Sequence, residues 1–362
     1  MLVSFLSICY NGVQSTVFRR KFRGASPYKG DLEDMGKVSA FLKRKNVLFS
    51  AKRYGIDAMG AMAQGLFASL LIGTIIKTLG QQLNVQFLID AGNFAQQVAG
   101  PAMAVSIGAA LSAPQLVLYS LIAVGMAANK LGGAGGPLAV YFITIVASEC
   151  GKIVSKETKV DILVTPAVTI LVGVGLSVLC APAIGAAASS VGDFIKWATN
   201  LQPLLMGILV SVVVGMALTL PISSAAICAA LSLTGLAGGA EVAGCCAQMV
   251  GFAVMSFREN GVGGLVSQGL GTSMLQMPNI IRNPRVWIPP TLASAITGPI
   301  ATCLFHLEMN GPAVSSGMGT CGLVGRVGLI LICFVLPAVL TLLFAFFLRK
   351  WGWIKGGDLK LQ

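Results

Sequence analysis

The sequence predicts an all-α integral membrane protein. Hydrophobic residues make up 55% of the 362 residues and charged residues only 10%, whereas a soluble domain carries about 25% charged residues to keep its surface wetted. The mean hydropathy is +0.83. The apolar runs are continuous instead of alternating, which disfavours a β-barrel. We therefore expect most of the protein surface to face lipid.

The apolar runs are long enough for on the order of ten transmembrane helices, because a helix needs about 20 apolar residues to cross the hydrocarbon. Polar or Gly/Pro-rich turns separate the runs from one another. We expect spans at residues 55–79, 88–111, 114–129, 136–154, 160–186, 202–220, 222–237, 238–257, 287–307 and 327–348.

The distribution of positive charge predicts the orientation. Eleven Lys and Arg residues face only three Asp and Glu residues before residue 54, in a chain of net charge +12, and such a flank favours the cytoplasmic side of a first span. An even number of crossings then keeps three more basic-rich stretches, 152–161, 258–285 and 349–362, in the cytoplasm. We expect cytoplasmic N- and C-termini and three parts: a basic segment (1–54), a polytopic transport domain (55–348) and the tail 349–362.

The excess positive charge is not accompanied by signs of nucleic-acid binding, since the basic segment has no zinc ligands and no recognition motif. Attraction to anionic lipid is the simpler interpretation. The expected partner of this segment is therefore the lipid bilayer, and nucleic acid is not an expected partner.

The reactive residue types form no recognisable catalytic, metal or cofactor site. The nine cysteines lie mostly inside apolar runs and never in CxxC spacing, as expected for small buried hydrophobic residues. His306 is the only histidine, and the chain contains no P-loop and no HExxH motif. We expect no catalytic residue, no bound metal and no cofactor in this chain.

Polar residues inside the apolar portion indicate function, because an ionised side chain at the bilayer centre costs at least about 2.5 kcal/mol. The densest group is FHLEMNGP (305–312), which contains His306, Glu308 and Asn310. In an extended stretch these side chains, two residues apart, share one face. They offer the acceptors and donors that sugar hydroxyls need. The alternative is an ordinary extracellular loop.

A second polar group begins with Glu259 and Asn260 in FRENG (257–261) and continues with Gln276 and Asn279. This tract is too polar to span a membrane and too apolar for a plain loop, which is typical of a re-entrant hairpin. The charges at its start could instead mark a cytoplasmic boundary. The small polar residues at 315–326 are a candidate for a second re-entrant hairpin.

Other embedded polar residues have simpler interpretations. Asn93, Gln96 and Gln97 share a helical face, where amides more often join helices than bind a solute. Glu241 falls at an expected span end, from which its side chain would reach the interface. A small polar solute is therefore expected to bind in the C-terminal half, between residues 257 and 326.

Three stretches carry a family resemblance: 204–227 (LLMGILVSVVVGMALTLPISSAAI), 257–280 and 297–325. Together they resemble the membrane (IIC) component of the bacterial phosphoenolpyruvate-dependent sugar phosphotransferase system, in the branch that includes PfoR-type regulatory proteins. The resemblance implies a homodimer in the bacterial cell membrane that binds a sugar at a midplane site and alternates access. It also implies soluble IIA and IIB partners, which carry the phosphoryl group on their own His or Cys residues.

In proteins of this kind a glutamate and a histidine near the re-entrant loops contact the sugar. The matching candidates are Glu308 and His306, with Glu259 as a second acid. The full set of candidate sugar contacts is Glu308, His306, Asn310, Glu259, Asn260, Gln276 and Asn279.

Two alternatives remain open. The chain could carry a small polar solute without phosphotransfer, or it could be a membrane-bound regulator or sensor of the PfoR type whose basic segment contacts a partner. The lack of a fused IIA or IIB module and the basic segment leave room for both. As an enzyme, the chain would be at most the membrane part of a sugar phosphotransferase.

Overall fold

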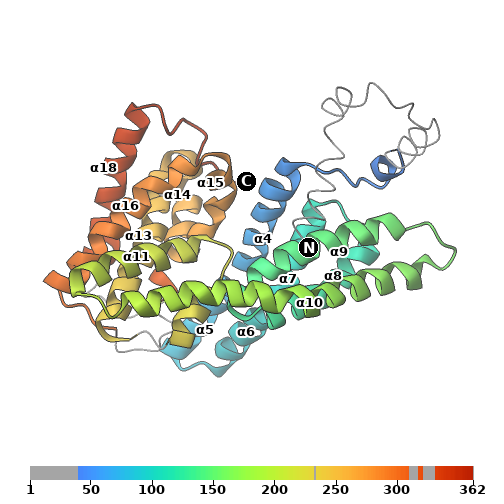
Figure 1. The fold of residues 1–362 in the computed structure, drawn as a ribbon, viewed down its shortest axis with the longest axis horizontal. Coiled ribbons are helices and arrows are strands. Elements are labelled where there is room, and N and C mark those ends of the chain that lie inside the picture. Colours follow the sequence, from blue (N-terminus) through green and yellow to red (C-terminus); the bar gives the residue numbers. More distant parts are fainter. Residues whose placement is uncertain (1–39, 232–233, 310–316, 321–330, 362) are drawn as a thin grey trace, which may run out of the picture. The chain divides into compact units, whose positions relative to one another are not determined.

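The computed structural model describes residues 40–231, 234–309, 317–320 and 331–361 (Figure 1). Throughout this part of the chain the regular structure is helical, which confirms the all-α class. Contacts divide the chain into two units, Met1–Leu48 and Phe49–Gln362. The first unit contributes one short helix at residues 40–44, and everything that follows belongs to the second unit.

Five stretches of the described residues are long and apolar enough to cross a membrane, which confirms a multi-pass membrane protein. They are Arg53–Leu83, Gln115–Val154, Asp161–Ala198, Gly235–Met255 and Ile332–Lys350. Two shorter apolar helices, Ala99–Ala110 and Pro203–Thr219, accompany them. Ten crossings therefore remain a prediction.

The N-terminal half of the second unit is a bundle of paired helices. It consists of η1 (Arg53–Asp57), α4 (Ala58–Leu66), η2 (Phe67–Leu71), α5 (Ile72–Leu83), α6 (Gln86–Gln97), α7 (Ala99–Ala110), α8 (Gln115–Gly132), η3 (Gly133–Gly135) and α9 (Gly136–Val154). Helix α5 packs on α6, α4 on α7, and α8 on both α7 and α9. The Gln96 amide donates to the Thr74 hydroxyl at 2.8 Å, so it joins α6 to α5.

One predicted span of this bundle differs in the structure, and a second break falls between two predicted spans, 114–129 and 136–154. The expected span 88–111 is broken at Val98 (φ −90°, ψ 13°) into α6 and α7, because Pro101 has no N–H to continue the helix from the Gln97 carbonyl. The long apolar stretch Gln115–Val154 is divided at Gly133, whose φ of +51° and ψ of −121° suit glycine. Helices α8 and α9 therefore form a packed hairpin.

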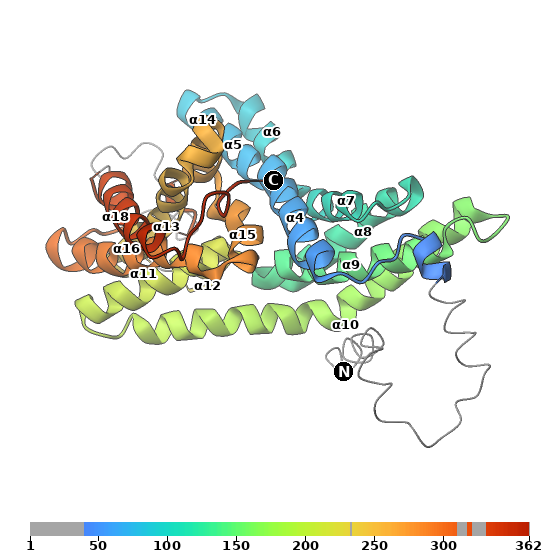
Figure 2. The same cartoon turned by 90° about the horizontal axis from the view of Figure 1, so that it is seen from above.

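Helix α10 (Asp161–Ala198) links this bundle to the next one. It packs on α8 and α9 at one end and on α11 and α12 at the other (Figure 2). Its buried face is a row of small residues spaced by four, which allows close helix approach. The row is Thr165, Thr169, Gly173, Ser177 and Ala181. The predicted span ended at residue 186, twelve residues before the helix does.

The C-terminal half is built around one buried helix. Its elements are α11 (Pro203–Thr219), α12 (Ser224–Leu231), α13 (Gly235–Met255), α14 (Phe257–Val266), η4 (Ser267–Gly271), η5 (Ser273–Gln276), α15 (Met277–Arg282), η6 (Pro284–Trp287), α16 (Ile288–Pro299), η7 (Ile300–Leu304), η10 (Leu331–Val335) and α18 (Leu336–Lys350). Helices α11, α16 and α18 all pack on α13, which is buried along nearly its whole length.

Glycines let α11, α13 and α16 touch backbone to backbone. A Cβ added to Gly244 of α13 would lie 2.0 Å from the Ser211 carbonyl oxygen of α11, and one added to Gly298 of α16 would lie 2.1 Å from the Gly207 carbonyl oxygen. The Ser211 hydroxyl also donates to the Ser294 carbonyl of α16 at 2.8 Å. The three helices therefore form a tightly packed bundle.

Gly244→Ala is expected to lower the melting temperature of the purified protein, because the added methyl group overlaps the α11 backbone and overpacking costs about 1 to 3 kcal/mol. The matched control is Gly175→Ala on α10, where an added Cβ meets no atom within 4 Å. This control should be neutral or slightly stabilising, since alanine favours helix. Thermal denaturation of both variants in one detergent checks the prediction, and equal melting temperatures would contradict it.

Candidate functional site

Two groups of polar side chains lie at opposite ends of α13. The first includes Glu259 and Asn260, whose backbone N–H groups both bond to the Ser256 carbonyl directly after the helix ends. The second, His306 and Glu308, lies just before Met309. The Met309 backbone pairs with Gly235, at the start of the helix, through two hydrogen bonds of 2.9 Å. The 21 residues of α13 span about 31 Å. A single small solute therefore cannot touch both groups at once.

The first group is carried by a hairpin of short, irregular helices. Glu259 and Asn260 lie in the first turn of α14, which is kinked at Gly261 (φ 60°, ψ −156°). Gln276 ends η5, and Asn279 lies three residues later in α15. At that spacing their side chains meet, and the Asn279 amide donates to Gln276 Oε1 at 2.7 Å.

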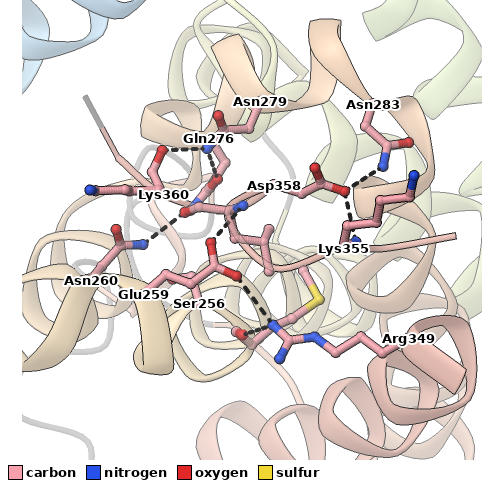
Figure 3. A network of polar contacts seen from close by, with 12 residues as sticks. Ser256, Glu259, Asn260, Gln276, Asn279, Asn283, Arg349, Lys355, Asp358 and Lys360 are labelled. Carbon is pink, nitrogen blue, oxygen red and sulfur yellow. Dashed lines mark hydrogen bonds and ion pairs between the residues drawn. The ribbon is translucent and has the colours of Figure 1, made fainter. Parts of the chain in front are cut away.

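These four side chains, which we call the clasp, bind the main chain of the C-terminal tail (Figure 3). Glu259 Oε2 accepts the Leu359 N–H at 2.9 Å. Four amide contacts complete the set: Asn260 Nδ2 to Leu359 O at 2.8 Å, Asn260 Oδ1 from Leu361 N at 2.8 Å, Gln276 Nε2 to Leu359 O at 3.0 Å, and Asn279 Nδ2 to Lys360 O at 3.0 Å.

The tail is fixed at further points along its length. Arg349 lies 3.6 Å from Glu259 and donates to the Met255 carbonyl at 3.1 Å. Asn283 donates to the Trp353 carbonyl and to Asp358, each at 2.9 Å. Two apolar tail residues are buried in the main core, Ile354 and Leu359. The tail is therefore docked on the hairpin and on the core in this structure.

A cavity of about 190 Å³ adjoins the clasp. Its walls come from α4, from the hairpin and from the tail, through residues Gly60, Gln64, Leu275, Pro278, Asn279, Lys360 and Leu361. Asn279 is only 2% exposed, and its Oδ1 atom has no hydrogen-bond partner among the described residues. Asn279 therefore lines the cavity while its carboxamide oxygen is buried without a partner.

The second group lies on an extended stretch. His306 and Glu308 are exposed, whereas Leu307 is partly buried and Met309 is 2% exposed. The two polar side chains therefore share the outer side, as expected for extended backbone, although His306 has a left-handed φ of +43°. Asn310 lies outside the described residues.

The structure corrects the expectation that Glu241 lies at a span end, with its side chain reaching the interface. Glu241 lies within α13 and is 0% exposed, with the Cys228 thiol beside its carboxylate. The backbone of the 305–309 stretch passes close by, since a Cβ on Gly239 would lie 1.8 Å from the Leu307 carbonyl oxygen. Glu241 is the one acidic residue in the apolar run 235–255. This isolated charge is the sequence signal that could have identified Glu241 as a candidate functional residue.

A family model described as Phosphotransferase system, EIIC, matches residues 56–361. The chain belongs to this family. It is thus the membrane component of a sugar phosphotransferase system and a multi-pass protein of the bacterial cell membrane. The family implies a sugar substrate and a soluble IIB partner. A search of curated proteins finds no match, and a search of solved structures finds none either.

Both polar groups of this EIIC chain have the chemistry that sugar recognition needs, namely carboxylate and amide oxygens as acceptors with N–H groups as donors. In the described part of the chain no cluster of three or more His, Cys, Asp or Glu residues could hold a metal ion. Of the predicted stretch 315–326, the structure describes residues 317–320. There the Thr320 hydroxyl donates to the Gly269 carbonyl at 2.6 Å, so this stretch touches the hairpin.

Proposed function

We propose that this chain is the sugar-transporting IIC subunit of a phosphotransferase system, which binds a sugar inside the membrane and releases it to a separate IIB protein for phosphorylation. The match of the EIIC family model to residues 56–361, nearly the whole second unit, carries this proposal. The chain itself supplies binding and movement of the sugar. The phosphoryl group comes from its soluble partners.

The two polar groups fit the two ends of a transport path. We place the clasp on the cytoplasmic side with both termini, because the 258–285 stretch and the tail are rich in Lys and Arg. The His306 and Glu308 side chains then lie toward the opposite side. Glu241 lies along α13 near that end and is added to the candidate sugar contacts. The midplane site, ten crossings and a homodimer complete the proposal.

Uptake of a radiolabelled sugar by cells that express this chain is expected to require matching IIA and IIB proteins. The physical reason is that phosphorylation inside traps the sugar, whereas the chain alone only equilibrates it. The measurement compares cells with and without the two partners. Uptake that is indifferent to them would refute phosphotransfer coupling, and a proton or sodium dependence would then favour an uncoupled carrier.

Glu308→Gln is expected to weaken sugar affinity about tenfold, because it removes a charged acceptor for hydroxyl groups, and a hydrogen bond to a charged group contributes about 1.5 to 3 kcal/mol. Glu157→Gln is the matched control, since Glu157 is exposed in the distant 152–161 turn. Equilibrium binding of labelled sugar to purified protein measures both variants. Unchanged binding by Glu308→Gln would return the 305–309 stretch to an ordinary loop.

The basic segment 1–54 favours a second candidate function, a membrane-bound regulator or sensor, because its eleven Lys and Arg residues exceed what orienting one span requires. Deleting residues 1–50 separates the two functions. A transporter keeps its sugar uptake, since the family match begins at residue 56. A transcriptional output that disappears while uptake survives would support the regulator.

A further inference from the structure

The clasp recognises the tail through its main chain. Each of the five contacts from Glu259, Asn260, Gln276 and Asn279 goes to a backbone N–H or carbonyl group of residues 359–361. Peptide groups present donors and acceptors at short spacing, as the hydroxyls of a sugar do. The tail thus bonds to carboxylate and amide groups of the kind that can bind sugar hydroxyls.

The tail also holds the two arms of the hairpin together. Asn260 lies on α14, whereas Gln276 lies at the end of η5, and both donate to the one Leu359 carbonyl. Gly261 lies within the α14 arm itself, at a φ of +60°, and η4, between the two arms, packs against α13. The Leu359 carbonyl therefore adds a link between the two arms.

The end of the tail forms part of the wall of the cavity beside the clasp. Lys360 and Leu361 line this cavity together with Gln64 of α4. Its volume of about 190 Å³ exceeds that of an engineered cavity of about 150 Å³ that holds a benzene molecule. Withdrawal of the tail would enlarge this cavity and expose the clasp to it.

We propose that residues 353–361 are an autoinhibitory strap, which competes with the transported sugar for the clasp. With the strap docked, the cytoplasmic end of the path is closed, and a sugar that reaches the clasp displaces the strap. The inference rests on the proposed transport function, because the competing ligand is the transported sugar itself. If the strap is docked about 90% of the time, its release raises apparent sugar affinity about tenfold.

Leu361→Pro tests the strap without changing the clasp. Proline removes the N–H that Asn260 Oδ1 accepts, and it lies at the end of the described chain, where it disturbs no helix. Gly356→Ala is the control in the same tail, because an added Cβ there meets no atom within 4 Å. The expected result is about fourfold tighter sugar binding by Leu361→Pro, because one of the five clasp contacts is lost and the strap is only partly released, and wild-type binding by Gly356→Ala.

Hydrogen exchange of the full chain in lipid nanodiscs gives a second measurement. The amide hydrogens of Leu359 and Leu361 are bonded to the clasp, so residues 352–361 should be protected in the free protein. The probes are D-glucose, N-acetyl-D-glucosamine and D-mannitol, each at saturating concentration. A sugar that binds should increase exchange in this peptide and leave exchange in α13 unchanged.

The outcomes separate the strap from the function on which it rests. A sugar that binds while residues 352–361 stay protected overturns the strap and leaves the transport function standing. Equal or weaker affinity in Leu361→Pro also overturns it. Binding by Leu361→Pro of a sugar that the wild type binds weakly or not at all supports it. Failure of every probe to bind either protein defeats the transport proposal for these sugars and the strap with it.

Discussion

Backbone contact at Gly244 and Gly298 is the constraint on which the C-terminal half depends. Lipid gives helices no hydrophobic reason to associate, so close packing and bonds such as Ser211 to the Ser294 carbonyl must hold them together. Because α11 and α16 approach so closely, α13 is buried between them. Both candidate polar groups are then positioned from the ends of this one rigid helix.

The hairpin after α13 is irregular, so its backbone and side-chain amide groups need hydrogen-bond partners that a regular helix would otherwise supply. Irregular backbone at membrane depth is tolerated only where protein or water covers it. Here the tail provides that cover: Leu359 is fully buried, and the clasp amides bond to the tail backbone instead of to water. The tail therefore supplies hydrogen-bond partners to the hairpin, and the hairpin fixes the position of the tail.

Composition was sufficient to predict the helical membrane class, whereas the two-residue spacing of His306 and Glu308 predicts a shared side only if the stretch is extended. The partner of the clasp was not predictable, because Glu259 bonds to a backbone group 100 residues away, and backbone groups are the same in every sequence. The burial of Glu241 was not predicted, because the hydropathy of one helix does not show which other helices pack against it and cover its side chains. The roles of the candidate site residues remain predictions, because the positions of their side chains do not identify the ligand that they bind.

The length of α10 ties the protein to its lipid environment. Its 38 residues extend about 57 Å, and a tilt of about 40°, the upper end of the usual range, still leaves a vertical height of about 44 Å across a hydrocarbon layer of about 30 Å. Part of the helix must therefore lie among the headgroups. The tilt of α10 then depends on the acyl-chain length of the surrounding lipid, because hydrophobic mismatch sets helix tilt. A change in this tilt alters the spacing of the two bundles that α10 links.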